Sequence, residues 1–187
     1  MRAFVFPGQG AQTIGMGKAL ADAYPAAKAV FDEVDAALGQ DLSGLIWNGD
    51  IADLTLTENA QPALMATSIA VLRALEAEGV TIKAASFVAG HSLGEYAALA
   101  ASGAIGLADT ARLLRTRGRA MQEAVPVGVG AMAAILGLEF AAVQEIAAEA
   151  GVSEALLYKL FPSKQAIFLE ILQRRSNLRI LPVPLHI

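Results

Sequence analysis

The sequence of 187 residues contains no cysteine and only two histidines, His91 and His186. The absence of cysteine excludes disulfide bonds, a thiol nucleophile and a cysteine-ligated metal site. Two histidines are too few for a metal site built from several imidazoles. We therefore expect no bound metal.

Charged residues are also scarce, at 17%, while hydrophobic residues make up 55% and the mean hydropathy is +0.50. This composition excludes an intrinsically disordered or low-complexity chain. The longest uncharged stretches have 14 or 15 residues, whereas a membrane-spanning helix needs about 20. Pro7 and Gly8 interrupt the N-terminal segment, which does not have the pattern of a signal peptide. We expect a soluble, cytoplasmic protein that does not bind membranes.

The net charge of −4 is unevenly distributed. Residues 151–187 contain five basic and two acidic side chains, so residues 1–150 carry a net charge of −7. A change of sign along a chain can mark a module boundary, here near residue 150. The alternative is a chance distribution, because only two or three charges decide the difference.

Short apolar segments alternate with segments of helical periodicity in the first 150 residues. The expected strands are 3–6, 85–89 and 133–136, and the expected helices are 15–38, 63–78, 95–102, 107–123 and 139–150. Residues 57–62 are expected to form a loop, with Pro62 in the first turn of the following helix. Alternating strands and helices indicate an α/β domain with a mostly parallel sheet.

The pattern of expected elements changes after residue 150. Residues 151–153 form a turn that ends in Ser153, a favourable helix N-cap. Short helices are expected over 154–161 and 165–175, and the last dozen residues are expected to be frayed or extended. The sequence therefore predicts a partial α/β core followed by a short all-helical tail.

The strongest chemical motif is Gly90–Gly94, with the sequence Gly-His-Ser-Leu-Gly, which we call the elbow. In this G-x-S-x-G pattern a sharp turn presents the serine hydroxyl at the end of a strand. Glycines on both sides of Ser92 leave room where side chains would clash. The dipole of the following helix favours negative charge at this place, and the Leu93 amide can donate to an oxyanion. The alternative is a glycine-rich turn with a surface serine; the strand–turn–helix context favours the nucleophile.

A serine nucleophile needs a base. His91 is adjacent to Ser92, but neighbouring strand residues face opposite sides, so we expect it to pack or hydrogen-bond beneath the elbow. His186 is the other candidate base. The sequence leaves the choice between them open.

Two further features could contribute to a binding site. Residues 7–10 follow the first strand, and their glycines allow backbone amides to approach a ligand, although an ordinary turn has the same composition. Arg115, Arg117 and Arg119 alternate along one expected helix. Residues two apart do not share a helix face, so we expect at most one of them at the elbow and the others in solvent. An arginine at the elbow would bind a carboxylate through its planar guanidinium.

Five motifs together resemble bacterial malonyl-CoA:acyl-carrier-protein transacylases, from Met1 to about Ala150. In order along the chain they are Phe4–Gln12, Leu56–Leu64, Gly90–Leu99, Arg117–Pro126 and Gly130–Leu138. The resemblance implies an acyltransferase of fatty-acid synthesis with a hydrolase-like core. It requires no cofactor, because malonyl-CoA is the substrate and acyl carrier protein is the partner that accepts the acyl group.

The resemblance also implies roles for single residues. Ser92 would attack the malonyl thioester, and the malonyl-serine would pass its acyl group to the phosphopantetheine thiol of the carrier protein. The amides of Gln9 and Leu93 would form the oxyanion hole. Arg117 would pair with the free malonyl carboxylate, and Gln61 would lie near the substrate pocket.

The chain departs from this family after Ala150. Family members are longer, and their catalytic histidine and the remaining strands of the core come from the second half. The resemblance therefore implies that residues 1–150 are the N-terminal part of a truncated transacylase domain. Residues 181–186 are similar to the stretch that carries the family's histidine, which makes His186 the candidate base of that family.

Residues 146–175 resemble a helix-turn-helix fragment of TetR-type repressors. The resemblance implies that a helix over 154–161 enters the major groove of DNA and that Tyr158 and Lys164 contact phosphates. The bracing first helix and the dimerisation domain of those repressors are absent, so one half-site would bind mainly through phosphates. The alternatives to an acyltransferase are thus a DNA-binding fragment, residues 151–187, or a hybrid chain with neither activity.

Overall fold

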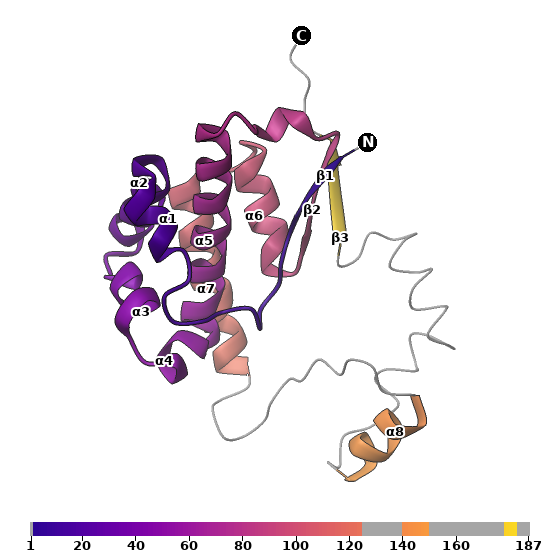
Figure 1. Ribbon diagram of the computed structural model, residues 1–187. Helices are drawn as coiled ribbons and strands as arrows, with labels where there is room; N and C mark the ends of the chain where they lie inside the picture. The colour runs from indigo at the N-terminus through magenta and orange to yellow at the C-terminus, as the bar shows by residue number, and fades with distance from the viewer. Residues whose placement is uncertain (1, 125–139, 150–177, 183–187) are drawn as a thin grey trace. The chain divides into compact units, whose positions relative to one another are not determined.

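The computed structural model describes residues 2–124, 140–149 and 178–182 (Figure 1). The chain divides into two compact units, residues 1–126 with 177–187 and residues 127–176. Helix α8, Phe140–Glu149, is the described element of the second unit. The described elements of the first unit are β1 Ala3–Phe6, α1 Lys18–Ala23, α2 Pro25–Leu38, α3 Leu42–Asn48, α4 Ile51–Thr55, α5 Thr57–Ala77, a 3-10 turn Ile82–Ala84, β2 Phe87–His91, α6 Leu93–Ala101, α7 Leu107–Ala124 and β3 Leu178–Pro182.

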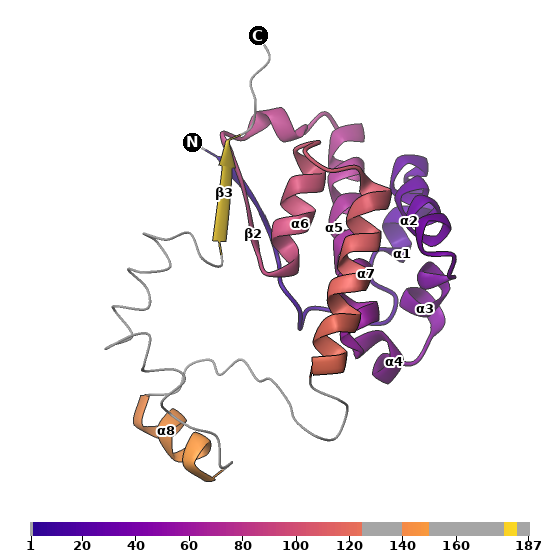
Figure 2. The ribbon, with the colours of Figure 1, turned by 180° about the vertical axis from the view of Figure 1, so that it is seen from behind.

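The sheet of the first unit has the strand order β1-β2-β3 (Figures 1 and 2). Strands β1 and β2 are parallel, with Phe6 opposite Gly90, which confirms the parallel pairing expected from the sequence. Strand β3 is antiparallel to β2, with Leu178 opposite His91. The expectation of an all-helical tail is therefore wrong, because residues 178–182 belong to the sheet of the first unit.

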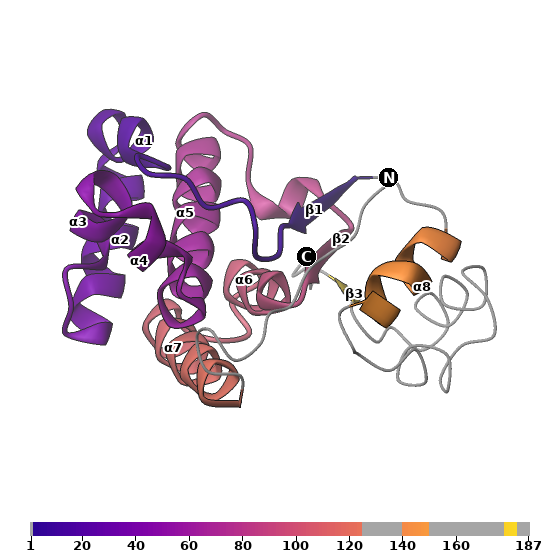
Figure 3. The same cartoon turned by 90° about the horizontal axis from the view of Figure 1, so that it is seen from below.

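Helix α6 lies between the sheet and the other helices of the first unit. It packs against β1 and β2 on one side and against α5 and α7 on the other (Figure 3). Helices α5 and α7 also pack against each other and against α2. This arrangement places the end of β2, the start of α6 and the C-terminal half of α7 around one point.

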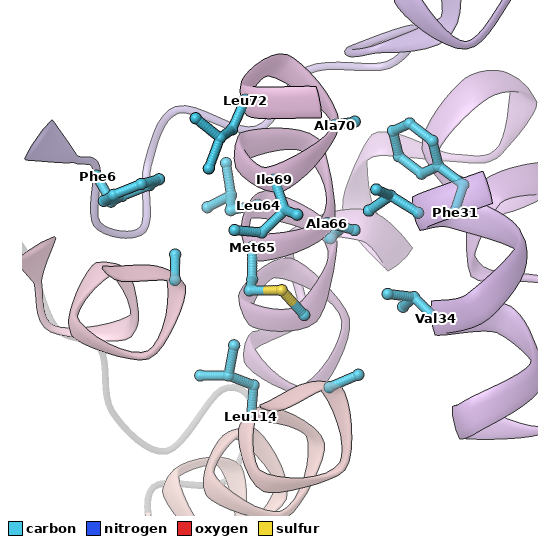
Figure 4. Packing of buried hydrophobic residues seen from close by; sticks show 14 of the residues in the cluster. Phe6, Phe31, Val34, Leu64, Met65, Ala66, Ile69, Ala70, Leu72 and Leu114 are labelled. Carbon is cyan, nitrogen blue, oxygen red and sulfur yellow. The ribbon is translucent and has the colours of Figure 1, made fainter. Parts of the chain in front are cut away.

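The hydrophobic core centres on α5, whose side chains contact elements on several sides (Figure 4). Met65 and Ile69 are fully buried between Phe6 of β1 and Phe31 of α2, and Leu114 of α7 closes the cluster. Replacing a buried Met or Ile by alanine costs about 2–5 kcal/mol in comparable cores. The core thus fixes α5 relative to the strand that leads into the site.

The helices differ from the expected ones in two places. The helical segment expected over 15–38 is broken at Tyr24, because Pro25 begins a new helix at a position where its missing N–H is not needed. The loop expected over 57–62 is wrong: α5 begins at Thr57 and contains Pro62 inside the helix. Helices α3 and α4 were not expected; Asp41 and Asp50 cap their first turns by accepting hydrogen bonds from backbone amides.

The other expected elements agree with the structure within two residues where they are described. These are β1, β2, α6, α7 and α8. The expected strand over 133–136 and the expected helices over 154–161 and 165–175 lie outside the described residues. None of the described helices is long and apolar enough to cross a membrane.

Candidate active site

The elbow joins β2 to α6 in the local structure that the sequence predicts. Ser92 has φ 56° and ψ −113°, and it is the only non-glycine residue with positive φ in the described part of the chain. Such a conformation costs on the order of 1–3 kcal/mol and persists only where the surrounding structure enforces it. Strain of this kind at a hydroxyl-bearing residue is typical of a functional turn.

The two glycines of the elbow are required by backbone packing. A methyl group at Gly90 would overlap the backbone carbonyl of Gly94. A methyl group at Gly94 would overlap the carbonyl of Phe6, the last residue of β1. Both glycines therefore allow the strand end, the turn and the helix to meet at distances that no side chain permits.

Two segments of backbone, the start of α6 and the loop after β1, meet at the elbow. Leu93 is the first residue of α6, so its N–H is among those for which a helix provides no internal acceptor. Gln9 follows Gly8, and a methyl group on Gly8 would lie 3.2 Å from the carbonyl oxygen of His91. The loop after β1 thus runs alongside the elbow. The roles of the Gln9 and Leu93 amides in an oxyanion hole stay predictions.

Arg117 of α7 is the cation that the structure brings to Ser92. Its Nη2 donates to the Oγ of Ser92 at 2.8 Å, and its Nη1 donates to the Oε1 of Gln61 at 2.6 Å. The centre of its guanidinium lies 6.0 Å from the centroid of the Tyr96 ring. Three elements, α5, α6 and α7, therefore converge on one half-buried guanidinium.

Gln61 is completely buried, and both ends of its amide are engaged. Its Oε1 accepts from Arg117, and its Nε2 donates to the Sδ of Met121 at 3.3 Å. Met121 and Tyr96 were not singled out from the sequence. Helical spacing could have found both, because Met121 lies four residues after Arg117 on α7 and Tyr96 lies four residues after Ser92.

The arginines two residues before and two residues after Arg117 have different surroundings. Arg119 is exposed, as expected, and its Nε lies 3.0 Å from the Oε2 of Glu58. Arg115 is not in solvent: it is 7% exposed and donates to Asn59 and Gln40 at 2.6 Å each. Burial lowers the pKa of Arg115, and the nearby Glu58 carboxylate partly opposes this shift. The expectation of solvation fails because the N-terminal turns of α5 cover this part of α7.

Of the two candidate bases, His91 lies within the described residues and His186 does not. His91 is exposed, and its ring lies against Gly8, since a methyl group there would come within 2.5 Å of the Nδ1 of His91. His186 lies outside the described residues, as do Tyr158 and Lys164. Strand β3 runs away from the elbow, so that Pro182 lies beside Phe87. The identity of the base stays a prediction.

An apolar groove of about 320 Å³ lies elsewhere in the first unit. Residues of β1 and α5 line it, among them Val5, Val71 and Leu75, and neither Ser92 nor Arg117 belongs to its lining. Within residues 2–124, 140–149 and 178–182 no group of three or more His, Asp or Glu side chains is arranged to hold a metal ion. The described contacts at the elbow join a serine, an arginine and a glutamine.

The chain matches the acyl transferase domain family over residues 3–156. The malonyl CoA-acyl carrier protein transacylase of Bacillus subtilis (strain 168) is 56% identical over 144 residues, which cover 77% of this chain and 44% of that protein. The protein of the same name from Escherichia coli (strain K12) is 49% identical over 148 residues, covering 79% and 47%. The chain thus spans less than half the length of these curated relatives.

Solved structures give the same picture. The acyl-carrier-protein S-malonyltransferase from Bartonella henselae superimposes with a TM-score of 0.71 and 46% identity, over 98% of this chain and 63% of that one. A malonyl-transacylase in complex with its type II polyketide synthase acyl-carrier protein superimposes with a TM-score of 0.69 and 44% identity. That match covers 79% of this chain and 47% of the relative.

Proposed function

The chain belongs to the acyl transferase domain family, and we propose that it carries the nucleophile-bearing part of a malonyl-CoA:acyl-carrier-protein transacylase. One observation carries the proposal: the strained Ser92 at the elbow lies in hydrogen-bond contact with the guanidinium of Arg117. A hydroxyl next to a fixed cation suits an acyl donor that bears a carboxylate. The relatives named as malonyl transacylases support this substrate class.

In the proposed reaction the Oγ of Ser92 attacks the thioester carbonyl of malonyl-CoA. The C–S bond breaks, coenzyme A leaves as a thiol with the serine proton, and a malonyl-serine ester remains. The phosphopantetheine thiol of an acyl carrier protein then attacks this ester and regenerates the hydroxyl. The backbone amides of Gln9 and Leu93 stabilise the oxyanion of both tetrahedral intermediates.

Arg117 selects the acyl group. Its guanidinium pairs with the free carboxylate of the malonyl group. Acetyl-CoA has no such carboxylate. Gln61 supports this role, because it is buried and bonded to Arg117. The proposal needs no cofactor, and a relative solved together with its carrier protein supports the partner. A cytoplasmic location stays a prediction.

We assign residues 1–150 to the N-terminal part of the transacylase domain, in line with the boundary expected from the sequence. DNA binding by residues 151–187 rests on sequence resemblance alone, and its contact residues Tyr158 and Lys164 lie outside the described part of the chain. We therefore propose the acyltransferase function and not the DNA-binding one.

The proposal is tested by the intact mass of the purified chain after brief exposure to malonyl-CoA. We expect one malonyl adduct in the wild type and none in Ser92→Ala. His91→Gln and His186→Gln then identify the base, because only loss of the base should abolish the rise of the acylation rate with pH. A folded chain that gains no adduct would contradict the proposed function.

A further inference from the structure

Within the described part of the chain, the guanidinium of Arg117 donates to one fully buried side chain and to one partly buried side chain. Its Nη1 is bound to Gln61, which is completely buried and is held at its other end by Met121. Its Nη2 is bound to the Oγ of Ser92, which is only partly buried at the elbow. The Gln61 bond therefore anchors the guanidinium, and the Ser92 bond is the one that can open when a ligand arrives.

The bond to Ser92 affects the reactivity of the hydroxyl. A cation that donates to Oγ occupies one of its two lone pairs and draws electron density away from it. A carboxylate accepts the same N–H more strongly than a neutral hydroxyl does, because both partners are then charged. A carboxylate near Arg117 must therefore compete with Ser92 for Nη2.

We propose that Arg117 holds Ser92 in an unreactive hydrogen bond until the carboxylate of the acyl group takes Nη2. This inference rests on the proposed function for the identity of the acyl group. A neutral acyl group leaves the Arg117–Ser92 bond intact, so acid selectivity arises at the attack step as well as in binding. Arg117 is then a specificity residue that acts on the nucleophile itself.

The competition is tested by binding, with formate as the probe. If formate and the Ser92 hydroxyl compete for Nη2, deleting the hydroxyl must tighten formate binding, because linkage is reciprocal. We expect Ser92→Ala to bind formate about threefold to tenfold more tightly than the wild type, as measured by titration of the ¹⁵N-labelled arginine side chains. Ser102→Ala is the matched control, since its hydroxyl donates to the carbonyl of Leu99 at the other end of α6. Equal or weaker binding by Ser92→Ala overturns the proposal.

Reactivity supplies the second test, with a neutral alkyl phosphonofluoridate. Oγ forms a bond to phosphorus, fluoride leaves, and the serine proton goes to solvent. We expect formate to accelerate labelling of the wild type, while chloride at the same ionic strength does not. Arg117→Gln should label faster than the wild type without formate and show no response to it, whereas Arg119→Gln should behave like the wild type.

Slower labelling of Arg117→Gln would overturn the proposal, because it would mean that Arg117 activates the hydroxyl. The two proposals fail separately. Absence of a malonyl adduct together with tighter formate binding in Ser92→Ala would refute the transacylase function and leave the competition intact. A malonyl adduct together with unchanged formate binding would do the reverse.

Discussion

Replacing Arg115 by methionine should destabilise the fold without changing acyl selectivity. Arg115 joins the middle of α7 to α5 by donating to Asn59, and it also reaches Gln40 after the end of α2. Methionine keeps the length and most of the apolar stem of the side chain, so the change removes mainly the guanidinium. The nearest carboxylate oxygen, from Glu58, is 3.8 Å away and forms only a loose ion pair.

The size of the stability loss follows from the two hydrogen-bond acceptors that lose their donor when the guanidinium is removed. Asn59 is 8% exposed, and its Oδ1 would lose its donor, at a cost of about 1–3 kcal/mol. Gln40 is exposed and can bond to water, so its loss should cost about 0.5 kcal/mol. Relief of the buried charge offsets part of this sum. We expect Arg115→Met to lower the free energy of unfolding by about 1–3 kcal/mol.

Urea unfolding followed by circular dichroism measures this loss. Arg119→Met is the matched control, because its exposed ion pair with Glu58 should contribute at most about 1 kcal/mol. Asn59→Leu by itself removes the hydrogen bond from Asn59 to the carbonyl of Asp53, so the second comparison is made within that background. There Arg115→Met should cost less than in the wild type, because the acceptor that it would leave unpaired is already absent. The reasoning is refuted if Arg115→Met and Arg119→Met lose the same amount, or if Arg115→Met costs as much in the Asn59→Leu background as in the wild type.

Three other perturbations follow from single contacts. Gly118→Ala should lower the free energy of unfolding by about 1–3 kcal/mol and weaken the proposed acylation of Ser92, because the new methyl group would lie 2.5 Å from the Cα of Glu58 and separate α7 from α5. Urea unfolding measures the first effect and adduct formation the second. The bond from Tyr24 to Glu78 raises the pKa of Tyr24, so the stability it contributes should be present below about pH 10 and be lost as the pH rises further. Tyr24→Phe should therefore unfold with a weaker dependence on alkaline pH. Val5→Lys should reduce self-association measured by light scattering, because Val5 lines the apolar groove, is 68% exposed and lies on the outer strand β1 of the sheet formed by the described residues.

Local sequence patterns predicted the parts of the site that depend on local geometry. The apolar run before Pro7, the glycine spacing at the elbow and the periodicity of 107–123 each specify one element, and the structure has all three. Which arginine of α7 meets Ser92 follows from no local pattern. It depends on how α7 is rotated against α5 and α6, which the packing of the whole core decides.

The loop predicted over 57–62 is wrong because contacts distant in sequence determine the structure of this segment. Asn59 and Pro62 favour a loop over 57–62 with the helix beginning near the proline. In the structure the helix already begins at Thr57, so that Pro62 lies inside it. Proline leaves the carbonyl of Glu58 without its usual intrahelical donor. Hydrogen bonds from the arginines of α7 hold this turn of α5 in place. Gly118 permits the close approach of the two helices, because a side chain there would meet the backbone of Thr57 and Glu58. No pattern within 57–62 could reveal a neighbour that lies sixty residues further on.

The mispredicted turn is also the part of α5 that builds the site. Glu58, Asn59 and Gln61 each bind one arginine of α7, namely Arg119, Arg115 and Arg117 in that order, at contacts that depend on a helical start to α5. A loop at these positions would leave Gln61 free to move, and Arg117 would lose its fixed anchor. Local preference and final structure therefore disagree where the chain positions Arg117, the cation that we propose binds the acyl carboxylate, as expected when tertiary contacts stabilise a site against local propensity.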